Sequence, residues 1–146
     1  MSQRKIGEFK LKVSSLRVLP GAQNYEASAA GEGKFAGIPV SVIFTHIGQT
    51  LPDGSEIATS EGFLRAKEGC DTAFVQAIAG FRCEGQRRPG EAQRWQGAGA
   101  FKSQSQRFME LNGRVFWLEG RLDLAAGSSH HQWWALDMGF DEDEHG

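Results

Sequence analysis

The fold class of this chain is decided by the stretch Glu8-Phe9-Lys10-Leu11-Lys12-Val13, in which charged and apolar residues alternate. Successive side chains of a β-strand point to opposite faces, so this pattern places one face in a core and the other in water. The same two-residue period recurs at residues 40–45 and in most of the chain, and no long amphipathic helix interrupts it. The chain is therefore predicted to be an all-β protein.

Turn signals divide the alternating pattern into strands joined mostly by short hairpins. Strands are expected at residues 8–19, 24–35, 40–49, 56–67, 72–84, 95–104, 114–124 and 130–137, with a further strand favoured at 105–111. A β-bulge at Ser14-Ser15 explains why the apolar phase changes within the first strand. Asp53-Gly54 and Asn112-Gly113 lie between alternating runs and are predicted to be hairpin tips.

A meander of eight or nine antiparallel strands favours closure, because closure removes the exposed edges of the sheet. We therefore predict an antiparallel up-and-down β-barrel, with a two-sheet β-sandwich as the alternative. One domain is expected to cover residues 1–138. The acidic segment 139–146 is expected to be a disordered tail.

Composition excludes several classes of function. The 146 residues have a net charge of −2, and the body of the chain carries 16 basic and 14 acidic residues once the four acids at 141–144 are set aside (18 − 4). No basic patch typical of nucleic-acid binding follows from this balance. No apolar run approaches the length of a membrane helix, and none follows the N-terminus as in a signal peptide. A cytoplasmic protein with reduced Cys70 and Cys83 is expected.

Four short elements support a family resemblance. They are Gly31-Glu-Gly-Lys-Phe35, Pro52-Asp-Gly-Ser55, Glu61-Gly-Phe63 and Leu111-Asn-Gly-Arg114. Together they resemble small bacterial barrel proteins of the allene-oxide-cyclase-like and dirigent-like type. The resemblance implies a barrel that encloses a small-molecule cavity, in which some members guide a cyclisation. Its motifs are turn motifs, so it transfers no catalytic residue to this chain.

Aromatic residues that fall in phase with apolar strand faces are the candidates for lining such a cavity. Small alanine and glycine positions on the same faces would leave the space between them open. The predicted ligand-binding residues are Phe35, Phe44, His46, Phe63, Phe81, Trp95, Phe101 and Trp134.

Three ionisable residues are candidates for acid–base chemistry. His46 continues the apolar face of Val40, Val42 and Phe44, and an imidazole titrates near neutral pH. Tyr25 shares a face with small residues of the second strand. Glu61 faces the cavity only if the charged face of its strand is internal, and it is otherwise a solvated carboxylate.

Two further polar runs allow more than one interpretation. Glu119, Arg121 and Asp123 form either an exterior charge ladder or, less favourably because burying charges is costly, a row inside the barrel. His130 and His131 point to opposite faces of a strand, so they cannot chelate one metal, and one of Trp133 and Trp134 should point inward. No metal and no cofactor is expected, since no catalytic or nucleotide-binding motif occurs.

Three functions follow from these observations. The first is binding of a small apolar or aromatic molecule in the barrel. The second is a cofactor-independent cyclase or isomerase that uses the same cavity, and the third is an oligomeric structural or interaction module. A homo-oligomer is expected in any of these cases, with neither nucleic acid nor membrane as a partner.

Overall fold

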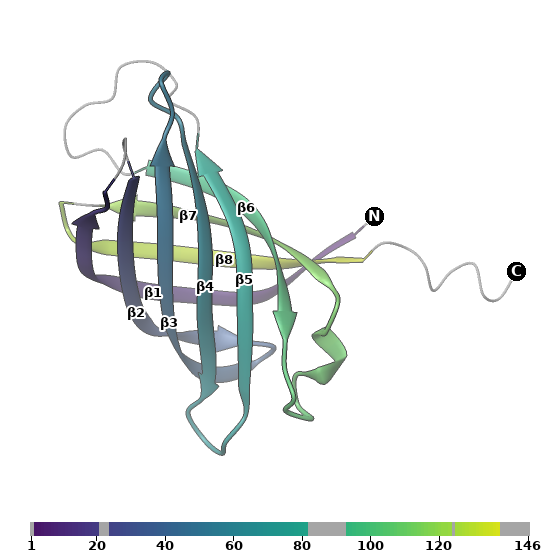
Figure 1. Cartoon of the computed structure of the whole chain (residues 1–146). Helices are drawn as coiled ribbons and strands as arrows, with labels where there is room; N and C mark the ends of the chain where they lie inside the picture. Colours follow the sequence, from purple (N-terminus) through teal and green to yellow (C-terminus); the bar gives the residue numbers. More distant parts are fainter. Residues whose placement is uncertain (1, 21–23, 82–92, 124, 138–146) are drawn as a thin grey trace, which may run out of the picture.

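The structure is a computed structural model, and it describes residues 2–20, 24–81, 93–123 and 125–137. The described residues form eight strands and one short 3₁₀ helix, which turns connect (Figure 1). They are β1 (Ser2–Val18), β2 (Asn24–Phe35), β3 (Ile38–Thr50), β4 (Glu56–Ala66), β5 (Thr72–Phe81), β6 (Gln93–Lys102), η1 (Met109–Leu111), β7 (Val115–Asp123) and β8 (Ser128–Asp137).

Each strand pairs with its neighbour in sequence, and β1 pairs with β8, so the sheet closes into an antiparallel up-and-down barrel. This confirms the predicted up-and-down β-barrel and excludes the alternative, a two-sheet β-sandwich. The predicted bulge is also present, because the register of β1 against β2 shifts between Val13 and Ser15. A second register shift lies between Lys5 and Gly7, where β1 pairs with β8.

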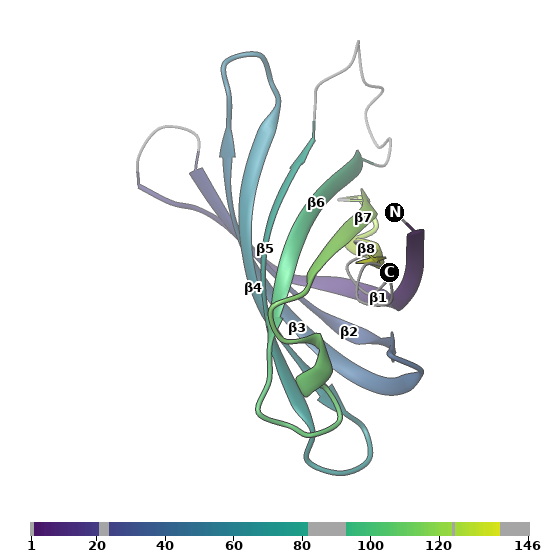
Figure 2. The same cartoon turned by 90° about the vertical axis from the view of Figure 1, so that its right-hand side faces the viewer.

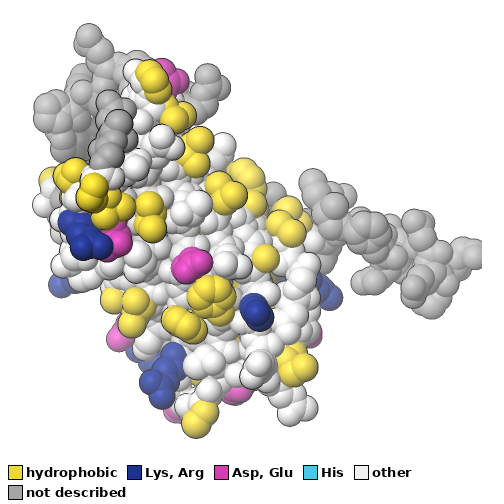
Figure 3. All heavy atoms as spheres, viewed as in Figure 1, with side chains coloured by type: hydrophobic (Ala, Val, Ile, Leu, Met, Phe, Trp, Pro, Cys, Tyr) yellow, Lys and Arg dark blue, Asp and Glu magenta, His cyan; other side chains and the backbone are white. Residues whose placement is uncertain are grey.

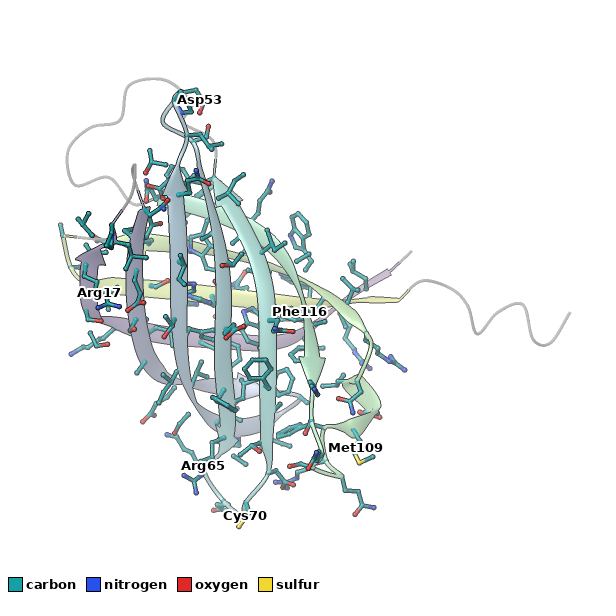
Figure 4. All side chains as sticks on the ribbon, in the orientation of Figure 1. Arg17, Asp53, Arg65, Cys70, Met109 and Phe116 are labelled. Carbon is teal, nitrogen blue, oxygen red and sulfur yellow. The ribbon has the colours of Figure 1, made fainter. Side chains whose placement is uncertain are left out.

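The two ends of the barrel carry different connections. The hairpin between β3 and β4 and the turn between β7 and β8 lie at one end, which we call the open end. The turn between β4 and β5 and helix η1 lie at the opposite end, which we call the closed end (Figure 2). Figure 4 shows Asp53 at the open end, and Cys70 and Met109 at the closed end.

The segment between β6 and β7 forms the plug of the closed end. The prediction of a strand at 105–111 is wrong, because this segment consists of turns followed by η1. Its Phe108 and Leu111 are buried in the barrel core. Burying these two apolar side chains closes the barrel end, which a straight strand in the wall would not do.

Hydrogen bonds of one side chain hold the plug in place. Asn112 accepts a hydrogen bond from the backbone of Ser103 at 2.7 Å and donates one to its carbonyl at 2.8 Å. Asn112-Gly113 is thus the end of a long connection rather than a hairpin tip, and that prediction is wrong. Asp53-Gly54 does lie in the tight β3–β4 turn, where Gly54 has a φ of +85°.

The core is concentrated at the closed end. Phe35 is fully buried there, and its ring lies 5.0 Å from that of Phe101 and 5.3 Å from that of Phe108. Trp133 packs against Phe9 at 4.6 Å and belongs to the same aromatic cluster. The tail at 139–146 and Cys83 lie outside the described residues, so the predictions on them are untested.

Candidate functional site

A cavity of about 460 Å³ occupies the open end of the barrel. Every strand contributes to its wall, from Leu16 in β1 to His131 in β8. Fifteen of its 24 lining residues are apolar, so the space suits a ligand with a mainly apolar body. The cavity is the part of the interior that the closed-end aromatic cluster does not fill.

Small side chains explain why this half of the barrel is hollow. Ala27, Ala58, Ala77 and Ala79 all line the cavity, on β2, β4 and β5. At the closed end the same strand faces carry larger residues, such as Phe35 on β2 and Leu64 on β4. The change of side-chain size along each strand therefore sets the boundary between packed core and cavity.

Two histidines bring polar groups into the apolar wall. His46 lies within hydrogen-bond distance of Ser60 through its Nδ1, and His131 lies 3.0 Å from the Ser129 hydroxyl through its Nε2. The two imidazole centroids are 6.4 Å apart. The ring of Phe44 stacks 5.9 Å from each of them, so the histidines and Phe44 form one surface of the cavity.

Burial keeps both imidazoles neutral. Loss of hydration lowers the pKa of His131 to about 3, with smaller contributions from the charges of His46 and His130. The pKa of His46 is also lowered, for the same reason. At neutral pH each ring therefore has one nitrogen that donates and one that accepts a hydrogen bond.

A second polar pair lies nearer the mouth of the cavity. The Tyr25 hydroxyl donates a hydrogen bond of 2.9 Å to Glu56, and Thr50 donates a longer one of 3.4 Å to the same carboxylate. Burial, together with the charge and hydrogen bond of Glu56, raises the pKa of Tyr25 above its usual range. The Tyr25 ring packs directly against Gly48 of β3. A Cβ at this position would lie 2.3 Å from the ring, so only glycine allows the contact.

The structure brings five of the predicted site residues together in the cavity wall. These residues are Tyr25, Phe44, His46, Phe81 and Trp95. Sequence phase located them because each shares a strand face with small or apolar residues that point inward.

The other predicted site residues lie elsewhere. Phe35 and Phe101 are buried in the closed-end core rather than in the cavity wall. Phe63, at 59 % exposure, and Glu61 lie on the outer surface of β4, where Gln76 donates a hydrogen bond to Glu61. Glu61 therefore cannot serve as an acid or base in the cavity, and Phe63 cannot line it.

The prediction that Trp134 lines the cavity is wrong. This side chain lies outside the barrel, with the Lys5 ammonium 5.8 Å from its ring centre, and its neighbour Trp133 points inward. The outward phase also applies to His130, which pairs with Glu8 on the surface. On β7, Phe116 and Leu118 face inward and Glu119 is exposed, in agreement with the exterior charge ladder.

Sequence reasoning missed several cavity residues. Ser60, Glu56, Ser129, His131 and Trp133 all line the cavity but were not predicted as binding residues. The phase of β8 was the missing information, because each of its two faces carries one histidine and one tryptophan. The pairing of Trp133 with Leu118 of β7 decides it.

The described residues contain no cluster of three or more histidine, cysteine or acidic side chains that could hold a metal ion. Within the same residues, no helix has the length and apolar character needed to cross a membrane.

Comparison with known proteins supports the barrel fold and gives no information on function. No family model matches the chain, and no curated protein matches it significantly. A solved structure from Clostridium acetobutylicum, described as a protein with unknown function, is similar with a TM-score of 0.77 at 10% identity, over 94% of this chain and 100% of that one.

Two further solved structures show the same likeness. A conserved protein of unknown function from Rhodopseudomonas palustris has a TM-score of 0.74 at 10% identity, covering 92% of this chain and 96% of that one. A β-barrel like protein from Acinetobacter baumannii has a TM-score of 0.72 at 11% identity, covering 93% and 96%. At this level of identity the likeness shows a shared barrel fold.

Proposed function

We propose that this barrel binds a small, mainly apolar or aromatic molecule in the cavity at its open end. The observation that carries the proposal is the 460 Å³ cavity itself, since interiors of folded proteins are otherwise packed with few voids larger than a water molecule. Side chains larger than alanine at these positions would fill this space and add packing contacts. A ligand that fills the cavity accounts for the small residues.

The arrangement of polar groups supports a ligand with one hydrogen-bonding group. His46 and His131 converge on one part of the mainly apolar wall, with Phe44 between them. Ser60 engages Nδ1 of His46, which leaves Nε2 as the ring nitrogen for a ligand hydroxyl or carbonyl. Because both imidazoles are neutral, a neutral polar group fits this wall better than a carboxylate.

A fluorescent probe tests whether the cavity accepts ligands. N-phenyl-1-naphthylamine, which is apolar and uncharged at neutral pH, should bind the protein with a rise in its emission. Ala58→Phe fills the cavity and should abolish this binding. Ala30→Phe places the same ring on the exposed outer face of β2 and serves as the matched control. Equal binding by both variants would contradict the proposal.

A second pair of probes tests the role of His46. Naphthalene and 1-naphthol share a ring system but differ in one hydroxyl, so their affinity ratio measures a hydrogen bond in the cavity. We expect His46→Leu to keep the barrel folded and to reduce the preference for 1-naphthol by roughly a factor of five, the effect of a hydrogen bond of about 1 kcal/mol. Glu119→Gln, on the outside of β7, should leave the preference unchanged.

A cofactor-independent cyclase or isomerase is the second candidate function. It is favoured by the neutral His46, which can accept a proton from a bound substrate, and by the Tyr25 hydroxyl nearer the mouth. Conversion of a bound compound that is lost in His46→Leu would support catalysis. The predicted likeness to allene-oxide-cyclase-like and dirigent-like proteins points in the same direction and stays a prediction.

A further inference from the structure

The outside of the barrel carries an unusual number of exposed large apolar side chains. Ile43, Phe63 and Ile78 are 61 %, 59 % and 63 % exposed, and Ile47, Ile57 and Val115 are each about half exposed. All six lie on β3, β4, β5 and β7, and the outer side of the intervening β6 carries Ala98 and Ala100. Isolated exposed apolar residues are common, but a contiguous group marks an interaction surface.

The strand register shows that these residues are contiguous. Ile43 pairs with Phe63, which pairs with Phe74 on β5, and the two phenyl rings lie 5.3 Å apart. A second row joins Ile47 through Thr59 to Ile78. We call this surface the outer face, with Ile57, Ala98, Ala100 and Val115 as its remaining apolar members. Figure 3 shows apolar side chains spread over this side of the barrel, with few charged ones among them.

The outer face contains both a ridge and a groove. The ridge is the row of Ile43, Phe63 and Phe74, which crosses β3, β4 and β5. The groove lies beside this row and also crosses the strands, from Thr45 on β3 over Gln76 on β5 to Val115 on β7. A surface with both shapes can fit a second copy of itself about a two-fold axis, because the ridge of each copy enters the groove of the other.

Charge and size agree with such a contact. Glu61 lies in the middle row of the outer face, and Lys102 lies on its border beside Phe74. A two-fold axis between these two positions places Glu61 of one copy opposite Lys102 of the other, which is an attractive arrangement. Measured along the curved sheet, five strands about 4.8 Å apart, each contributing seven residues of about 3.3 Å, cover roughly 550 Å². Two copies of this patch amount to roughly 1,100 Å², close to the ~1,200 Å² lower limit of stable interfaces.

We propose that the outer face of β3 to β7 is the interface of a two-fold symmetric dimer of this chain. The dimer buries Ile43, Phe63 and Ile78 against the partner copy and leaves the open end of each barrel free. A second copy is the occupant because ridge, groove and both signs of charge occur on one surface, as an isologous contact requires.

Sedimentation velocity over a wide concentration range tests the proposal. The wild-type protein should sediment with twice the chain mass of 16.0 kDa. Ile78→Lys and Phe63→Lys each bury a lysine in the apolar contact and should raise the dimer dissociation constant by roughly a hundredfold or more. Both positions are exposed in the single chain, so both variants should keep the wild-type circular dichroism spectrum and melting temperature.

Met109→Lys is the matched control, because Met109 is 52 % exposed but lies on η1 at the closed end (Figure 4). This variant should remain dimeric. A wild-type protein that stays monomeric at every concentration would overturn the proposal and direct the search to a different partner. A dimer that survives both lysine substitutions, or that Met109→Lys disrupts equally, would overturn it as well.

Discussion

The two ends of the barrel interior are built from the same strands but from side chains of different size. At the closed end, Phe35, Phe108 and Trp133 interlock in one aromatic cluster. At the open end, Ala58 and Ala79 leave the interior hollow. Stability is therefore expected to come mainly from one end, and ligand binding from the other. Because the strands run continuously through both, the packed end can hold the cavity walls in place.

The largest effect that distinguishes the two ends is expected from removing a phenyl ring. Phe35→Ala should lower the free energy of unfolding by about 3–5 kcal/mol, because it opens a void in a fully packed core. Phe81→Ala should cost less than about 2 kcal/mol, since Phe81 is half-buried and borders space that is already empty. Urea unfolding followed by circular dichroism measures both, and similar losses would break the comparison.

Acid should destabilise the protein through the histidines of the open end. The folded-state pKa of His131 lies near 3, below its ordinary value of 6.5, so the unfolded chain binds more protons between these pH values. The free energy of unfolding is therefore highest above pH 6.5, where His131 is neutral in both states. It decreases as the pH falls from 6.5 towards 3, because only the unfolded chain binds the proton. The slope approaches about 1.4 kcal/mol per pH unit.

Unfolding free energies measured across this pH window check the effect. His131→Gln should have a shallower pH dependence than the wild type. Trp134→Gln, which changes an aromatic residue on the outer face of the same strand, is the control and should keep the wild-type slope. An unchanged slope in His131→Gln would show that the cavity wall does not hold this imidazole neutral.

Enlarging an alanine should have opposite consequences at the two ends. Ala73 is 1 % exposed in the packed core, and Ala73→Leu should destabilise the barrel by about 1–3 kcal/mol through overpacking. Ala58→Leu projects into the cavity and should change stability by less than about 1 kcal/mol while weakening binding of N-phenyl-1-naphthylamine. Thermal unfolding and probe titration of both variants measure these effects. Equal destabilisation by both substitutions would show that the cavity cannot accept a larger side chain.

The smallest effects should be equal at the two ends. Gly113 at the closed end and Gly127 at the open end have φ values of +75° and +66°, and a Cβ at either position would meet no neighbouring atom. Replacing either by alanine should cost about 1 kcal/mol through backbone strain alone. A much larger cost at one end would show that the turns, and not only the interior side chains, differ between the ends.

Several features could be predicted from local residues because strand alternation is a local property. The inward faces of β2, β5 and β6 followed directly from residues such as Tyr25, Phe81 and Trp95. Trp134 could not be assigned, because its strand carries a tryptophan on both faces. The segment at 105–111 could not be assigned either, since its burial depends on an open barrel end that only the assembled strands create.

A two-residue apolar period is compatible with little besides extended strands, so the meander of antiparallel strands follows from the residues alone. The same period determines that His46 shares a face with Phe44. Which residues of different strands meet at the same height depends on the cross-strand register, a long-range property that is established only in the assembled barrel. Closure of β1 on β8 brought His131 beside His46, although they are far apart in the chain, and thereby formed the polar wall of the cavity.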